Sequence, residues 1–245
     1  MEKIRKILMC ICVAVIVFSS FKLYQQWSEY HKGEKEYQNL KNYINENNKN
    51  SDRENDDKEG VKVDFEKLKK INSQVIGWLY GKDTKINYPI TQAEDNDYYL
   101  THTFERKTNS SGCLFLDYNN MMNFKDDNSV IYGHHMKNGT MFAGLAEYKE
   151  QSYYNSHKTM LLLTPGRDYN VNIFAGYVTD EDDAAWQLSF DSDDEKKEWI
   201  SKVKQKSCFT SEITPKENDH ILTMSTCSYE FDDARFVLFG VLEKQ

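Results

Sequence analysis

A cysteine and an arginine near the carboxyl end of the chain could together carry out nucleophilic chemistry. Residues 221–227 (ILTMSTC) have the composition of a strand that ends in Cys227, and residues 235–242 (RFVLFGVL) that of a strand that begins with Arg235. If the two strands pair as a hairpin, the thiol and the guanidinium lie on one rim of a sheet. A thiolate is a strong nucleophile, and a nearby arginine can favour the thiolate or hold the oxyanion that forms when it attacks a carbonyl. The alternative for this stretch alone is a buried, inert cysteine followed by a surface arginine.

A nucleophilic cysteine needs a group that transfers protons, and two adjacent histidines are the best candidates. His134 and His135 follow Gly133 directly after a predicted strand at residues 129–132, where a functional loop would begin. A glycine before His134 lets the backbone turn sharply and leaves the imidazole accessible. The alternative is a turn that happens to contain two histidines. The remaining histidines stand alone along the chain and are expected on the surface or in packing roles: His31, His102, His157 and His220.

These side chains need a sheet to position them, and the sequence predicts about eight short strands with a few helices inserted. Besides the two strands above, we expect strands at residues 76–80, 86–90, 113–118, 129–132, 160–164 and 169–178. Helices are expected over residues 64–71, 141–148 and 193–206. Asp64 would cap the first helix, and Ser192 would open a capping box at the last. Many short strands separated by turns favour a closed barrel or a sandwich.

Composition and charge exclude several classes of protein. The net charge of −8, with no basic stripe, argues against a nucleic-acid partner. The five cysteines are too few and too scattered for a disulfide framework, and none lies in a C-x-x-C pair, so we expect no structural zinc site. The acidic runs at residues 180–183 and 191–195 suggest calcium, but a solvated loop and a helix N-terminus explain them better. The sequence therefore predicts no metal and no cofactor.

The N-terminus carries an apolar segment that suits a membrane. Basic residues precede the apolar residues 7–21, and Lys22, Tyr24 and Trp27 follow them. The run is shorter than the roughly 20 residues of a spanning helix, but flanking lysine and aromatic side chains can extend it. Positive charge on the N-terminal side predicts a cytoplasmic N-terminus and an exported remainder. A cleaved signal peptide is the alternative, and the lack of a small-residue cleavage site after Phe18 favours an uncleaved anchor.

The sequence thus divides into three expected parts. Residues 1–27 would form a cytoplasmic stub and membrane anchor, residues 28–60 a charged, Asn-rich linker, and residues 61–245 one folded domain. Within the linker, residues 29–44 could form a frayed helix, whereas residues 45–60 have the composition of a disordered segment. Such a linker would hold the domain off the bilayer.

Several motifs in the predicted domain resemble one family. Residues 223–227 (TMSTC) resemble the T-L-x-T-C signature of sortases, with Arg235 as the arginine of the following strand. Segments similar to those of class B sortases are residues 77–80 (GWLY), 95–102 (DNDYYLTH), 132–136 (YGHHM) and 138–142 (NGTMF). The spacing from His134 to Cys227 is also similar to that of class B members. Two departures are a volume-conserving Met224 in place of leucine and a short loop between the cysteine and the arginine.

The resemblance implies a mainly β fold with inserted helices. The expected architecture is an eight-stranded sortase-type barrel with an N-terminal helical segment and a helix before the nucleophile strand. In this family pattern Cys227 is the nucleophile, His134 protonates the leaving amine and later deprotonates the incoming one, and Arg235 holds the oxyanion or the substrate backbone. The backbone N–H of Ser228 could assist the arginine. The flanking side chains could shape the substrate pocket: Ser225, Thr226 and Ser228.

The resemblance also implies a reaction and its partners. The enzyme would be a cysteine transpeptidase that cleaves an NPQTN-like or NPxTG/SPxTG-like sorting signal after its threonine and forms a thioester. A peptidoglycan amine, or that of a lipid-linked precursor, would then take the surface protein. The chain would be a single-pass protein of the cell membrane, with the catalytic domain outside a Gram-positive cell. Two alternatives stay open: an exported binding or scaffold module without catalysis, and a thiol hydrolase that releases the acyl group to water.

Overall fold

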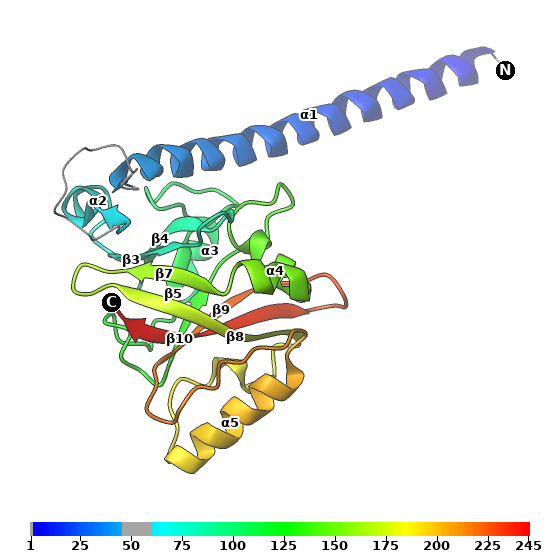
Figure 1. Ribbon diagram of the computed structural model, residues 1–245. Helices are drawn as coiled ribbons and strands as arrows, with labels where there is room; N and C mark the ends of the chain where they lie inside the picture. The colour runs from blue at the N-terminus through cyan, green and yellow to red at the C-terminus, as the bar shows by residue number, and fades with distance from the viewer. Residues whose placement is uncertain (1, 46–59) are drawn as a thin grey trace.

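Eight strands close into a barrel in the computed structural model, which describes residues 2–45 and 60–245 (Figure 1). The order around the barrel is β10-β8-β7-β3-β4-β5-β6-β9. Strand bounds are β3 (Val75–Tyr80), β4 (Asn87–Thr91), β5 (Leu114–Leu116), β6 (Asn128–Tyr132), β7 (Thr159–Leu163), β8 (Tyr169–Thr179), β9 (Ile221–Cys227) and β10 (Arg235–Lys244). The pairs β4–β5 and β6–β9 are parallel, and the other neighbours are antiparallel. The mainly β, eight-stranded barrel expected from the sequence is confirmed.

Strand β10 shows why the barrel is stable, because it is buried on both faces. Phe236 and Leu238 belong to the main apolar cluster, which also contains Trp78. Val237 and Phe239 alternate with them and belong to a second cluster together with Trp199. Trp199 lies on α5 (Asp193–Lys206), and so this helix covers the outer face of the barrel while Phe236 and Leu238 fill the inside.

Apart from α1 (Glu2–Leu40) and α5 the helices are short, and both α2 and α5 begin where the sequence predicted a cap. The bounds are α2 (Phe65–Ile71), α3 (Tyr98–Thr101), α4 (Gln151–Ser156) and the 3₁₀ segments η1 (Lys41–Tyr43), η2 (Phe142–Lys149) and η3 (Ala184–Trp186). Asp64 accepts a hydrogen bond from the Lys67 N–H at 3.0 Å, and Ser192 accepts one from the Glu195 N–H at 3.2 Å. The predicted helix over residues 141–148 is the 3₁₀ segment η2. The sequence did not indicate α3, α4 or η3.

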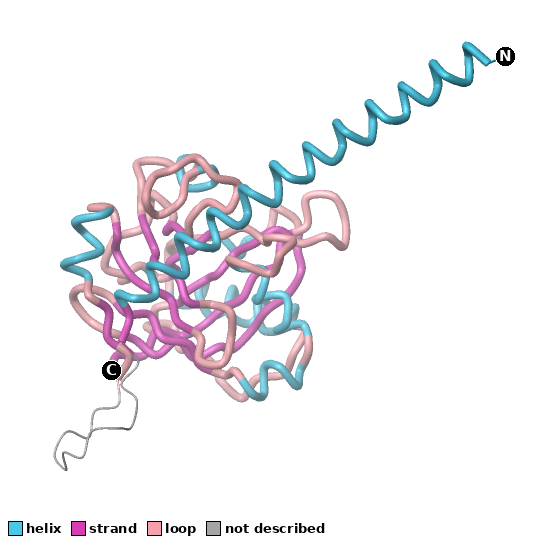
Figure 2. Tube along the Cα trace, turned by 90° about the horizontal axis from the view of Figure 1, so that it is seen from above, coloured by secondary structure: helices cyan, strands magenta, loops and turns pink. Residues whose placement is uncertain are grey.

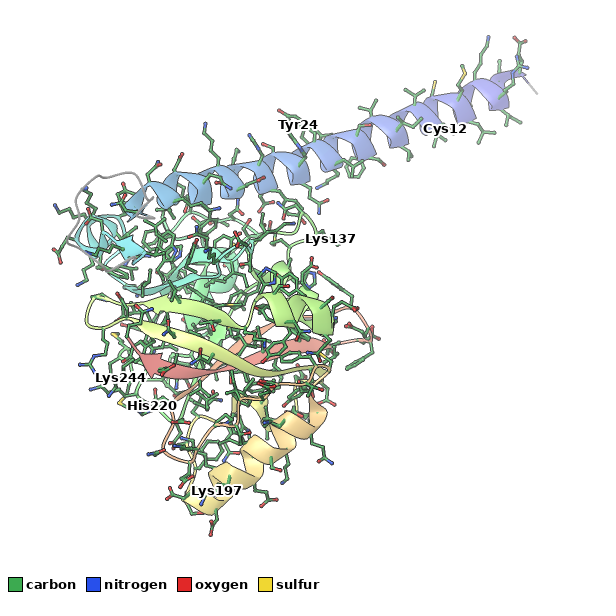
Figure 3. All side chains as sticks on the ribbon, in the orientation of Figure 1. Cys12, Tyr24, Lys137, Lys197, His220 and Lys244 are labelled. Atoms are coloured by element: carbon green, nitrogen blue, oxygen red, sulfur yellow. The ribbon has the colours of Figure 1, made fainter. Side chains whose placement is uncertain are left out.

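One long helix, α1 (Glu2–Leu40), extends far beyond the barrel (Figures 1 and 2). It is long and apolar enough to cross a membrane, by length and composition, and its most apolar window is 0% buried. The side chains of Cys12 and Tyr24 project from the free part of the helix into open space (Figure 3). This free part coincides with the anchor expected at residues 1–27.

The last turns of α1 are packed against the barrel, which differs from the expected linker. Gly33, Glu36, Tyr37 and Leu40 are buried on one face of the helix, at the spacing of helical neighbours. After η1, the short strand β1 (Ile44–Asn45) pairs with β2 (Lys62–Val63). The sequence analysis allowed a frayed helix at residues 29–44 but did not indicate its buried face, because this stripe of few residues is diluted by charged ones in the sequence. The expected disordered part, at residues 46–59, lies outside the described residues.

Candidate active site

Cys227 and Arg235 face each other across two paired strands. They are register partners at the end of β9 and the start of β10. Residues directly opposite in an antiparallel pair point to the same face, with Cβ atoms about 4.5–5.5 Å apart. The loop of residues 228–234 closes the hairpin through a hydrogen bond from the Ser228 N–H to the Ala234 carbonyl at 2.8 Å. The strands therefore bring the predicted thiol and guanidinium to one rim of the barrel.

The parallel pair β6–β9 brings His134 to the same rim. Tyr132 is the register partner of Ser225, and the Gly133 N–H donates to the Ser225 carbonyl at 3.1 Å beyond the last paired residues. His134 stands two residues after Tyr132, as Cys227 stands two residues after Ser225. In a parallel pair, residues in register share a face, so the histidine and the cysteine leave neighbouring strands at the same level.

Gly133 is required for close packing rather than for a sharp turn. A Cβ atom at this position would lie 2.3 Å from Leu114 Cδ2 and 2.7 Å from Phe142 Cδ2. The next carbonyl, that of His134, accepts a hydrogen bond from the Phe142 N–H at 2.9 Å. The start of η2 is thereby pressed against the end of β6, and this contact fixes the backbone from which the His134 ring projects.

The two ring nitrogens of His134 have different roles. Nε2 lies 2.6 Å from the Leu100 carbonyl oxygen. A carbonyl can only accept a hydrogen bond, so Nε2 carries a proton and Nδ1 is the nitrogen left to exchange one with a reactant. The ring also lies against the backbone of Gly112, where an added Cβ would be 3.1 Å from His134 Cδ2.

His135 binds the backbone at the end of β9. Its Nδ1 donates to the Cys227 carbonyl at 3.0 Å. The Tyr229 hydroxyl donates to the His135 carbonyl at 3.0 Å, and the two rings meet edge to face with centroids 5.0 Å apart. The sequence could not indicate this contact, because it depends on how the 228–234 loop folds back over the histidine.

Arg235 is anchored by its own loop. Its Nη1 donates to the carbonyls of Asp233 at 3.0 Å and Ala234 at 3.2 Å. Nη2 lies 3.8 Å from a Glu181 carboxylate oxygen, and the Glu181 side chain is 66% exposed. An ion pair this exposed contributes little. The loop carbonyls therefore orient the guanidinium and leave its other N–H groups for a reactant.

The polar residues beside Cys227 are mostly engaged in the protein itself. The Ser225 hydroxyl accepts from Trp186 Nε1 at 3.2 Å. The Ser228 hydroxyl donates to the Glu230 carboxylate and accepts from Lys149 Nζ. Among the described residues, the buried Thr226 hydroxyl has no hydrogen-bond partner. The Ser228 N–H, which could assist Arg235, donates to the Ala234 carbonyl in this conformation, because this bond closes the hairpin.

Lys149 and Glu230 form an ionic contact at the rim that the sequence did not suggest. Lys149, at the end of η2, pairs with Glu230 of the 228–234 loop, and its Nζ also lies 5.4 Å from the centre of the Phe236 ring. Hydrogen bonds from Lys149 and Ser228 lower the pKa of the Glu230 carboxyl to about 2. The contact ties η2 to the loop between the cysteine and the arginine.

The other cysteines and histidines of the barrel domain contact backbone or core atoms. Burial raises the pKa of the Cys113 thiol to about 12, so this sulfur stays protonated and inert. Burial also raises the pKa of Cys208, whose thiol donates to the Gly176 carbonyl at 3.0 Å. The Nδ1 atoms of three histidines each lie 2.9 Å from a backbone carbonyl: those of His102, His157 and His220. Within residues 2–45 and 60–245, no group of three or more metal-ligating side chains is present.

One large cavity lies away from this rim. It has a volume of about 770 Å³ and is lined by residues that include His220 and Lys244. Both labelled side chains lie near the C-terminus, at the end of the barrel opposite the β9–β10 loop (Figure 3). His220 directly precedes β9 and Cys227 ends it, so the length of this strand separates His220 from the thiol.

Comparisons with known proteins agree on one family. The sortase-domain family model matches residues 80–243. The sortase B of Listeria monocytogenes is 38% identical over 184 residues, which are 74% of this chain and 75% of that protein. A crystal structure of sortase B from B. anthracis matches with a TM-score of 0.76 and 30% identity, and covers 89% of this chain and 100% of that chain. The sortase B–substrate complex of Staphylococcus aureus matches with a TM-score of 0.70 and 32% identity over 74% of this chain and 84% of that chain.

Proposed function

The chain belongs to the sortase family of cysteine transpeptidases, and we propose that Cys227, His134 and Arg235 carry out its reaction. The observation that carries the proposal is the pair of strand registers. They bring His134, which is distant in the sequence, to the same end of the barrel as Cys227 and Arg235. These residue types supply a nucleophile, a proton carrier and a cationic hydrogen-bond donor.

The reaction has two halves, and His134 moves a proton in each. The Cys227 thiolate attacks the threonine carbonyl carbon of a sorting signal, and a C–S bond forms while the carbonyl becomes an oxyanion. The C–N bond then breaks, and the leaving amine takes a proton from His134. An acceptor amine attacks the resulting thioester and gives a proton to His134, a new C–N bond forms, and the C–S bond breaks to release the Cys227 thiolate. The thioester conserves the energy of the cleaved peptide bond for this transfer.

Arg235 acts on the charge that develops on the carbonyl oxygen. The carbonyls of Asp233 and Ala234 hold Nη1, and the remaining N–H groups of the planar guanidinium can then donate to the oxyanion or to the substrate backbone. Because the Ser228 N–H is engaged by Ala234, the arginine is the principal donor in this conformation.

The substrate is a C-terminal sorting signal of the NPQTN-like or NPxTG/SPxTG-like kind, and the acceptor is a peptidoglycan amine or that of a lipid-linked precursor. The relative from Staphylococcus aureus solved as a sortase B–substrate complex supports a peptide substrate. The free part of α1 would anchor the chain in the cell membrane, with the basic N-terminus inside and the barrel outside. In this proposal the enzyme attaches surface proteins to the cell wall of a Gram-positive bacterium.

The test is cleavage of a panel of fluorogenic sorting-signal peptides by the full chain in detergent, with products identified by mass. We expect a new amide product when an amine acceptor is present, and no cleavage by Cys227→Ala. The Cys113→Ala variant is the matched control for removal of a thiol and should retain activity. The thermal unfolding midpoint of the Cys227→Ala variant should stay within a few degrees of that of wild type, because the thiol lies at a partly buried rim position. A product hydrolysed by water even with the acceptor in excess would identify a hydrolase instead.

A further inference from the structure

The docked end of α1 holds one particular loop of the barrel, the connection of residues 103–112 between α3 and β5. The Glu29 carboxylate accepts from the Ser110 N–H at 2.8 Å. The Glu36 carboxylate, 7% exposed, accepts from the Glu105 N–H at 2.9 Å and from the Thr103 hydroxyl at 3.0 Å. Contacts along more than one turn of the helix thus fix this connection, which has no regular secondary structure of its own.

The hydroxyl group of Tyr37 is hydrogen-bonded to both ends of the 103–112 connection. Its Oη donates to the Gly112 carbonyl at 2.5 Å and accepts from the Phe104 N–H at 3.3 Å. The side chain is 4% exposed, and its ring meets that of Tyr88 edge to face at 5.3 Å. Removal of this hydroxyl would leave a buried carbonyl and a buried N–H without their partner, which proteins avoid.

Gly112, at one end of this bond, lies against the catalytic candidate His134. Its φ of +56° is in the left-handed region, and a Cβ there would lie 2.4 Å from the Tyr99 carbonyl oxygen and 3.1 Å from His134 Cδ2. Only a glycine backbone therefore fits between the end of α3 and the imidazole. The acceptor of His134 Nε2, the Leu100 carbonyl, belongs to the same α3 turn.

From this chain of contacts we propose that Tyr37 is a positioning residue for His134. The inference rests on the proposed function of His134. The imidazole is held by a carbonyl of α3 and by the Gly112 backbone, and Tyr37 fixes the second of these directly through its hydroxyl group. A displacement of the connection moves the ring and weakens the Nε2–H bond to Leu100, and errors of about 1 Å in such a site can reduce a rate by up to about 10². The end of the membrane helix is in this way part of the active site's support.

The test compares Tyr37→Phe with Tyr43→Phe in the full chain in detergent. Tyr43 is also in the docked segment and partly buried against the core, but within the described chain its hydroxyl has no hydrogen bond to the 103–112 connection. The first readout is the ¹⁵N spectrum of the histidine rings, with the His134 signals assigned from their loss in His134→Ala. The second is kcat and KM for a sorting-signal peptide that the wild-type chain cleaves.

We expect Tyr37→Phe to shift or broaden the His134 Nε2–H signal and to lower kcat by about tenfold, with KM within about twofold. Tyr43→Phe should match wild type in both readouts. A second variant, Gly33→Ala, reaches the same contact without changing Tyr37, because its Cβ would lie 2.6 Å from Ser111 Oγ. It should displace the Ser111 side chain, which is adjacent to Gly112, and change the His134 signals in the same way.

The two readouts separate this inference from the proposed reaction. Unchanged His134 ring signals in both Tyr37→Phe and Gly33→Ala would overturn the positioning role, whatever the activity. A shifted signal in these variants but not in Tyr43→Phe supports it. If the signal shifts while turnover is unchanged and His134→Ala stays active, the positioning role holds, and it is the catalytic role of His134 that fails.

Discussion

The adjacent residues His134 and His135 have different hydrogen-bond partners, and we expect different effects when they are substituted. His134 is bonded through Nε2 to the Leu100 carbonyl, whereas His135 donates from Nδ1 to the backbone of Cys227. We expect His134→Ala to be as inactive as Cys227→Ala in peptide cleavage. His135→Asn should keep most of the activity, because an asparagine amide can donate from nearly the position of Nδ1. The opposite order of activities would mean that the catalytic register is shifted by one residue.

Arg235 allows a sharper test, because its geometry and its charge can be separated. A lysine has the same charge but is a compact donor that cannot reproduce the planar fork. Loss of one oxyanion donor costs about 10²–10³ in turnover, so Arg235→Lys should lose at least about a hundredfold in the rate of acyl-enzyme formation. Single-turnover kinetics measure that rate, and circular dichroism checks the fold. A lysine variant that acylates within about threefold of wild type would show that only a positive field is needed.

The residues at the rim were predictable to different degrees. Cys227, Arg235 and His134 stand at strand ends that alternation and turn residues mark in the sequence, and the structure brings these ends together. The partners that fix them come from loops and from η2, as with the Lys149–Glu230 pair. Loop conformations depend on tertiary contacts, and so no local pattern indicates them. The engagement of the Ser228 N–H was missed for the same reason.

At the scale of elements, the 228–234 loop should respond to acid through one ionic contact. The pKa of Glu230 is lowered from 4.5 to about 2 by Lys149 and Ser228. A lowered folded-state pKa contributes stability above about pH 4.5, and this contribution is lost as the pH falls through about 2. The free energy of unfolding of wild type should therefore exceed that of Glu230→Gln at pH 6, and the difference should shrink between pH 4.5 and 2. Urea titrations at several pH values measure it, and a difference independent of pH would contradict the assignment.

The strands were the elements that the sequence predicted best, and the N-terminal helix the one it predicted least well. All eight strand segments occur, with boundaries shifted by a few residues, because each has the apolar run of a strand buried in a barrel. The docked part of α1 was taken for linker, since only Gly33, Glu36, Tyr37 and Leu40 are buried in it. One of these is glycine and another glutamate, so hydrophobic periodicity could not reveal the buried face.

At the scale of the whole molecule, the helix that would cross the membrane continues without interruption into the barrel. The free part and the docked part are one element, α1, and the docked part lies over the barrel in both views (Figures 1 and 2). An anchor joined in this way restricts the rotation of the barrel relative to the membrane far more than a disordered tether would. In a chain anchored through α1, the 103–112 connection, and through it His134, would therefore be linked to the orientation of the anchor.

The stability of truncated chains can show where the folded domain begins. Two truncated chains separate the alternatives: one begins at Ser28 and keeps the docked part of α1, and the other begins at Val61, where the sequence alone would place the domain. Tyr37, Leu40 and Ile44 are buried in the main core cluster, and each apolar side chain of this size contributes about 1.5–3 kcal/mol when buried.

Part of that gain is offset by the entropy of ordering the segment, so we expect a net loss of about 3 kcal/mol in the Val61 chain. For a domain of this size the loss corresponds to a thermal midpoint lower by about 10 °C. The Ser28 chain should unfold at the same temperature as the full chain, because the removed residues lie outside the barrel contacts. Differential scanning calorimetry measures all three. Equal midpoints for the Val61 and Ser28 chains would mean that the docked helix contributes no stability, and that the domain begins at residue 61 after all.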